Sequence, residues 1–123
     1  DIPADRATDG AFRTLADRGD QTPLIFFYGS PSWDEIIYRE ELEQLKKRLN
    51  LKLVHVLEHP HKDWTGEKGY ISAALLEYYL PEDRARWQYF MCGPLPMIQN
   101  VEPALIKVGV PPSHVHSERY EMA

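Results

Sequence analysis

The sequence predicts an α/β fold, an open parallel sheet with helices on both faces. Strand-like apolar runs alternate along the chain with segments whose apolar residues recur at helical intervals, which is typical of parallel sheets with helical crossovers. The first run, Leu24–Tyr28, is apolar throughout, as in strands that are buried on both faces. Glycines and prolines lie between the runs and mark the turns.

Each element follows from the local pattern. The predicted strands are Leu24–Tyr28, Leu51–Leu57, Gln88–Cys92 and Val115–Arg119. The predicted helices are Phe12–Asp17, a segment from Ser32 to Leu49, a segment from Ser72 to Pro81 and a segment from Pro94 to Gly109. The second helix begins with a capping box, Ser32–Glu35. The polar stretch Glu58–Gly69 is expected to be a loop.

The amino-terminal residues carry no strand signal. Residues 1–11 are polar and are expected to be irregular, and Arg18–Asp20 has the composition of a helix end. A doubly wound sheet that begins with a helix, without a strand before it, is unusual. We therefore expect the sheet to lack its first strand.

Length and composition limit the function. The 123 residues suffice for a single domain, 1–123, with a hydrophobic core, and the net charge of −5 disfavours a nucleic-acid partner. No apolar run is long enough to cross a membrane, and the first residues lack the pattern of a signal peptide. A single cysteine fits a reducing compartment. We therefore expect a cytoplasmic location, or the cytoplasmic face of a membrane-bound protein.

The segment Tyr89–Met97 is the strongest indication of a ligand site. A strand-like run ends at Cys92, the chain turns at Gly93, and Pro94 opens a helix. Ligands of open α/β sheets bind at the carboxyl ends of strands, and helix amino termini attract anions. The pattern therefore predicts a ligand pocket beside Cys92.

Other interpretations of the reactive residues stay open. Cys92 is also consistent with a small buried apolar residue or with a rhodanese-like nucleophile, whereas Ile98 occupies the position at which a thiol phosphatase needs arginine. The pairs His59–His61 and His114–His116 lack nearby ligands to complete a tetrahedral site, so we expect solvated histidines and no metal.

Several patches together resemble a known family, the NAD(P)-binding domain of the ferredoxin–NADP reductase superfamily. The similarity runs from about Phe12 to the carboxyl terminus, and its nearest branch is that of flavin reductases that serve oxygenases and ferric reductases. The patches are Phe27–Ser30, Trp64–Ile71, Met91–Pro94 with Met97, and Ser117–Tyr120.

The resemblance implies a Rossmann-like nucleotide-binding domain in an electron-transfer oxidoreductase. In that family, hydride passes from the nicotinamide C4 of NADH or NADPH to N5 of a flavin, FAD or FMN, on a separate β-barrel domain. The expected partners are the pyridine nucleotide, the flavin domain of the same protein and an electron acceptor, which could be an iron–sulfur protein, a heme or an oxygenase.

The resemblance also assigns roles by position. Residues after the first strand would contact the adenine-side ribose, although Ser32 also fits a helix cap. Cys92 would be a catalytic residue beside the nicotinamide C4, and Gly93 would let the cofactor approach the backbone. Glu118 would relay a proton at the flavin edge, unless it is a surface carboxylate, and Tyr120 would shield the flavin. The full set of cofactor-binding residues is Tyr28, Gly29, Ser30, Ser32, Cys92, Gly93, Pro94, Met97 and Tyr120.

Departures from the family pattern suggest a piece of a larger flavin reductase, or a variant with a diverged amino terminus. The chain has no G-x-G-x-x-G or G-x-G-x-x-P loop, no Arg-x-Tyr-Ser or Arg-x-Tyr-Thr flavin signature, and no room for a flavin barrel. Without its first strand the sheet would lose a central member, and strands of a second chain could fill the gap.

Two further questions follow from these departures. Pro31 stands where relatives that prefer NADPH have an arginine, which favours NADH. The absent glycine loop leaves an alternative function, a degenerate, non-catalytic interaction or regulatory domain that no longer binds nucleotide. A minor third hypothesis is a sulfur-transfer enzyme that uses Cys92.

Overall fold

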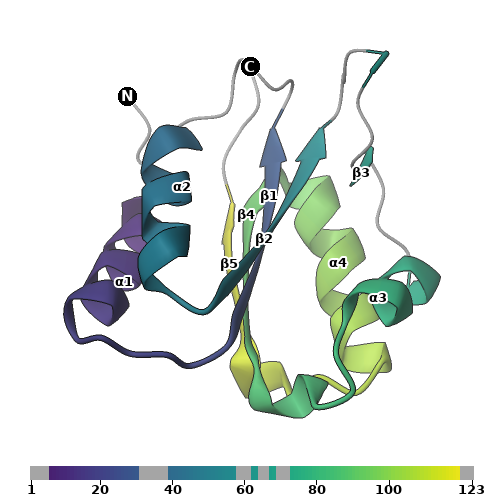
Figure 1. The fold of residues 1–123 in the computed structure, drawn as a ribbon. Helices are drawn as coiled ribbons and strands as arrows, with labels where there is room; N and C mark the ends of the chain where they lie inside the picture. Colours follow the sequence, from purple (N-terminus) through teal and green to yellow (C-terminus); the bar gives the residue numbers. More distant parts are fainter. Residues whose placement is uncertain (1–5, 31–38, 58–61, 64–66, 69–72, 120–123) are drawn as a thin grey trace.

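The fold is a five-stranded parallel sheet in the order β3-β2-β1-β4-β5, as predicted for an α/β protein (Figure 1). The computed structural model describes residues 6–30, 39–57, 62–63, 67–68 and 73–119. The strands are β1 (Leu24–Ser30), β2 (Leu51–Leu57), β3 (Glu67–Lys68), β4 (Gln88–Gly93) and β5 (Val115–Arg119). The described helices cover both faces of this sheet, which confirms the predicted fold class.

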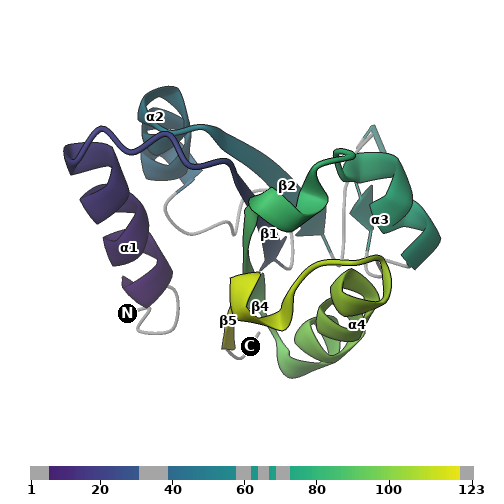
Figure 2. The same cartoon turned by 90° about the horizontal axis from the view of Figure 1, so that it is seen from below.

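The helices divide between the two faces of the sheet (Figure 2). One pair, α1 and α2, packs on one face, and the other pair, α3 and α4, packs on the opposite face. Their bounds are α1 (Arg6–Asp17), α2 (Arg39–Arg48), α3 (Ala73–Tyr79) and α4 (Leu95–Lys107). Within the described ranges, no helix combines the length and the apolar character needed to cross a membrane.

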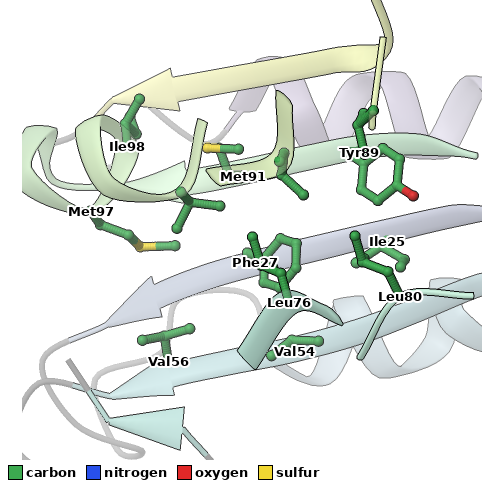
Figure 3. Packing of buried hydrophobic residues seen from close by; sticks show 13 residues of the cluster. Ile25, Phe27, Val54, Val56, Leu76, Leu80, Tyr89, Met91, Met97 and Ile98 are labelled. Carbon is green, nitrogen blue, oxygen red and sulfur yellow. The ribbon is translucent and has the colours of Figure 1, made fainter. Parts of the chain in front are cut away.

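The central strand β1 explains the layered arrangement. All of its residues are buried, and it is paired in parallel with β2 on one side and β4 on the other. Phe26 and Tyr28 belong to the core under α1 and α2, where Phe12 meets the Phe26 ring edge-to-face at 5.2 Å. Ile25 and Phe27 belong to the opposite core under α3 and α4 (Figure 3). Burial on both faces, predicted from the uninterrupted apolar run, is confirmed.

The pairing of β1 also corrects an expectation. We expected a missing first strand to leave a gap at the centre of the sheet, to be filled by a second chain. In the described part of the chain, β4 pairs directly with β1 from Leu24↔Gln88 to Tyr28↔Cys92, so the centre of the sheet is continuous. Exchange of strands between chains is therefore not needed to complete it.

The amino-terminal helix is longer than predicted. The expectation that residues 1–11 are irregular is wrong from Arg6 onward, because α1 begins there, six residues before Phe12. The sequence of its first turn, Arg6–Asp9, is mostly polar, and hydrophobic periodicity therefore gives no signal for it. The helix ends where predicted, at Asp17. Gly19 follows it with a φ of 67°, which suits glycine, and its amide donates to the Ala16 carbonyl.

Other boundaries differ from the sequence pattern for similar reasons. The predicted loop Glu58–Gly69 contains the short strand β3, which pairs with Val56 and Leu57 and is too brief to show alternation. Strands β1 and β4 extend further than predicted, to Ser30 and Gly93. The prediction ended them early because a glycine interrupts the pattern of apolar residues. The predicted capping box Ser32–Glu35 lies outside the described residues.

A buried tyrosine at the start of β4 generates a prediction. The Tyr89 hydroxyl donates to the Arg84 carbonyl at 2.7 Å, and burial raises the pKa of Tyr89 to about 12. We expect Tyr89→Phe to lower the free energy of unfolding at pH 7 by about 1 kcal/mol, because the part-buried Arg84 carbonyl loses the closer of its two donors and keeps the Trp87 amide at 3.3 Å. The folded tyrosine holds its proton at higher pH than the unfolded one, so stability falls between about pH 10 and 12.

Urea unfolding of wild type and Tyr89→Phe as a function of pH measures both effects. The variant should lose less stability than wild type across the alkaline range. Parallel pH profiles for the two proteins would show that Tyr89 does not contribute to the alkaline loss.

Candidate functional site

The order of the strands places a switch point between β1 and β4. From β1 the chain passes through α2 to β2 on one side, and from β4 it passes through α4 to β5 on the other. The connecting helices lie on opposite faces, as Figure 2 shows, so the chain diverges at the carboxyl ends of β1 and β4. In open α/β sheets, ligands bind in the crevice at such a point.

The predicted site residues from three strands lie together at this edge. Tyr28 on β1 is in register with Cys92 on β4, and Cys92 is in register with Glu118 on β5. Residues that are in register in a parallel sheet point to the same face, so these three form one row. The next positions, Gly29 and Gly93, face the opposite side, toward α4.

The row is mostly interior. Cys92 has no exposed surface and belongs to the core under α1 and α2, and Tyr28 and Ser30 are also buried. Glu118, on β5 near the edge of the sheet, is half-buried. The thiol thus packs as a buried group in this structure, and its role beside a nicotinamide stays a prediction.

The start of α4 adds a polar element to the crevice. Pro94 caps the helix with extended backbone at φ −71° and ψ 158°, and it makes no side-chain capping hydrogen bond. The amides of Met97 and Ile98 donate to the Pro94 carbonyl at 3.0 and 3.2 Å. Pro94 and Pro96 have no amide hydrogen, so this end of α4 favours a phosphate or another anion at the switch point mainly through the partial positive charge of the helix dipole.

Met97 lies over both strand ends. Its side chain is 8% exposed, and Figure 3 places it at the arrowhead ends of β1 and β4. A Cβ atom added at Gly93 would lie 2.5 Å from Met97 Sδ, and one added at Gly29 would overlap the same sulfur. The methionine therefore fills the space that side chains at these two positions would need.

The remaining predicted residues are not all placed. Ser32 and Tyr120 lie outside the described residues, as does the pair His59–His61. His114 and His116 make structural contacts, His114 Nδ1 with the Trp87 carbonyl at 3.0 Å and His116 by stacking on Phe90. Among the described residues, no group of three or more His, Cys, Asp or Glu side chains could hold a metal ion.

One residue of the row was missed from the sequence. His55 on β2 is in register with Tyr28, and the centroids of their rings are 6.2 Å apart. It continues the row of Tyr28, Cys92 and Glu118 across a fourth strand. The only signal in the sequence is a polar residue within an apolar strand, and its partners depend on strand register.

Comparison with known proteins identifies the family. Residues 8–103 match the family model of the oxidoreductase NAD-binding domain. The chain is 36% identical over 93 residues to human NADH-cytochrome b5 reductase 1, covering 73% of this chain and 30% of that protein. It is 34% identical over 94 residues to NADH-cytochrome b5 reductase 2 of Neosartorya fischeri, covering 74% and 29%. The chain thus spans about a third or less of these relatives.

Solved structures agree with this result. The FAD/NAD-binding domain of a Vibrio cholerae nitric oxide dioxygenase superposes with a TM-score of 0.72 at 20% identity, over 95% of this chain and 47% of that chain. The flavohemoglobin of Malassezia yamatoensis, with bound FAD and heme, gives a TM-score of 0.67 at 25% identity, over 89% and 27%. The predicted resemblance to the ferredoxin–NADP reductase superfamily is confirmed, and the chain belongs to the family of oxidoreductase NAD-binding domains.

Proposed function

We propose that this chain is the NAD(P)H-binding module of a flavin-dependent electron-transfer oxidoreductase. The observation that carries the proposal is the convergence of Gly29–Ser30, Cys92–Gly93 and the amino end of α4 at the switch point. When bound, the nucleotide supplies the hydride, which a flavin on a separate domain accepts. The role of this chain is to bind and orient the nucleotide.

The residues present fit a pyridine dinucleotide. The positive end of α4 favours the pyrophosphate, and the crevice between diverging crossovers is where such ligands bind in this class of sheet. The register of half-buried Glu118 with Cys92 supports the proposed role of Glu118 at the reacting end. The proposed nucleotide site therefore lies at the carboxyl ends of the strands and not at their amino ends.

The names of the relatives support a narrower proposal for cofactor and acceptor. Several are named NADH-cytochrome b5 reductases, and the flavohemoglobin contains FAD and heme. We infer that the nucleotide is NADH, that the flavin is FAD and that the acceptor is a heme protein. The alternative of a degenerate domain without nucleotide is not favoured by the match to an NAD-binding family.

Calorimetric titration of the chain with NADH tests nucleotide binding. We expect saturable binding with Kd between about 1 μM and 1 mM, the usual range for enzyme substrates. Leu95→Glu places a carboxylate on an exposed position in the first turn of α4 and should weaken binding at least about fivefold by repelling phosphate. The helix itself tolerates an acidic residue at this end.

Ile106→Glu is the matched control, because it makes the same change at an exposed position near the far end of α4. It should bind NADH like wild type. Absence of binding at millimolar NADH, or equal weakening by both variants, would contradict the proposed site.

The proposed role of Cys92 is tested in the complete protein, with its flavin domain. Cys92→Ser should slow hydride transfer at least about tenfold and change the Kd for NADH less than about threefold, as expected for a group that acts mainly in the transition state. Stopped-flow reduction of the flavin measures the rate. Val110→Ala, a buried change just after α4, controls for general loss of packing. Hydride transfer at the wild-type rate in Cys92→Ser would remove the catalytic role.

A further inference from the structure

The contact of Met97 with two strand-end glycines has a consequence for the site. A Cβ at Gly29 would lie 3.5 Å from Met97 Cε and 3.6 Å from Pro94 Cδ, and it would overlap Met97 Sδ. A Cβ at Gly93 would meet the same sulfur at 2.5 Å and the Gly29 Cα at 3.7 Å. One methionine side chain therefore packs against the backbone of both central strands.

Backbone conformation does not explain these glycines. Among the described residues, positive φ angles occur at Gly19 and Gly109, which end helices, and not at Gly29 or Gly93. Glycine weakens a strand, and within a strand it marks a place where another group approaches the backbone closely. In this structure the group that approaches is the Met97 thioether.

We propose that Met97 is a positioning residue, which sets the distance between the ends of β1 and β4 and the first turn of α4. On this account Gly29 and Gly93 are small in order to admit Met97. The inference rests on the proposed function, since the first turn of α4 is part of the nucleotide site.

Met97 is linked to the first turn of α4 through its backbone and to the strand ends through its side chain. The Met97 amide donates to the Pro94 carbonyl at 3.0 Å, and Pro94 itself follows Gly93 directly. A side chain at Gly93 would push the Met97 thioether away. Because Met97 is 8% exposed and its thioether also packs against Gly29, the thioether has little free space to move into, and the turn from Pro94 to Met97 would move with it. A shift of this turn changes the position of the helix end that faces the nucleotide.

A set of variants of the 123-residue chain tests the proposal by NADH titration, at a temperature at which circular dichroism shows each variant to be folded. We expect Gly93→Ala to weaken NADH binding about tenfold through overpacking. Adding Met97→Ala removes the obstructing sulfur, so the double variant should bind more tightly than Gly93→Ala alone. Val110→Ala, a buried change outside this contact, is the control for general loss of packing and should stay within about threefold of wild type.

Two outcomes would overturn the proposal. If the double variant binds no better than Gly93→Ala, the glycine serves the nucleotide directly, and if Gly93→Ala binds like wild type, the spacing has no effect on the site. If Met97 had a purely structural role, the variants would unfold at a lower urea concentration, but the Kd for NADH would not rise in Gly93→Ala and fall again in the double variant. Gly29→Ala, on the neighbouring strand, repeats the test if Gly93→Ala does not fold.

Backbone amide shifts without nucleotide separate this proposal from the proposed function. Gly93→Ala should shift the amides of Leu95 and Ile98, and the added Met97→Ala should move them back toward wild type. Shifts that the second change does not reverse would overturn the positioning role even where NADH binds. A wild-type chain that fails to bind NADH would contradict the proposed function, while reversal of the shifts would still support the positioning role.

Discussion

The pairing of β1 with both β2 and β4 is the constraint on which the rest of this molecule depends. It requires a strand that is apolar on both faces, because helices cover it above and below. The opposite crossovers from β1 and β4 then follow from the preferred handedness of parallel connections. Their divergence places a switch point at the carboxyl edge, where ligands bind in sheets of this class, so the topology predicts the candidate site.

The two cores give this edge its distinct sides. On the side of α1 and α2, the row of Tyr28, Cys92 and Glu118 places a hydroxyl, a thiol and a carboxylate beside a largely apolar core. On the side of α4, Met97 packs against strand ends that lack side chains. In the proposed function the first side supplies the reacting groups and the second side positions them, a division that is common where supporting residues hold a site in place.

Much of this arrangement could be predicted from the sequence, where local patterns determine it. The run Leu24–Tyr28 predicts a doubly buried strand, and Cys92–Pro94 predicts the passage from strand to helix that forms the site. The first turn of α1 and the two residues of β3 were missed, because the one is polar and the other too short for a periodic signal.

The site itself was predicted less completely than the fold. The place of His55 in the row depends on strand register, which residue spacing alone does not determine. The contact of Met97 with Gly29 and Gly93 depends on how α4 crosses two strands that are distant in sequence. The sequence suggested a cofactor contact at these glycines, which stays a prediction, and it gave no sign that Met97 packs against both of them.

The claim that a nucleotide binds at the switch point is tested most directly by mapping amide chemical shifts of the isotopically labelled chain during titration with NADH. We expect the largest changes at the carboxyl ends of β1 and β4 and in the first turn of α4. Changes concentrated at the amino ends of the strands, or on the outer surfaces of α1 and α2, would contradict it.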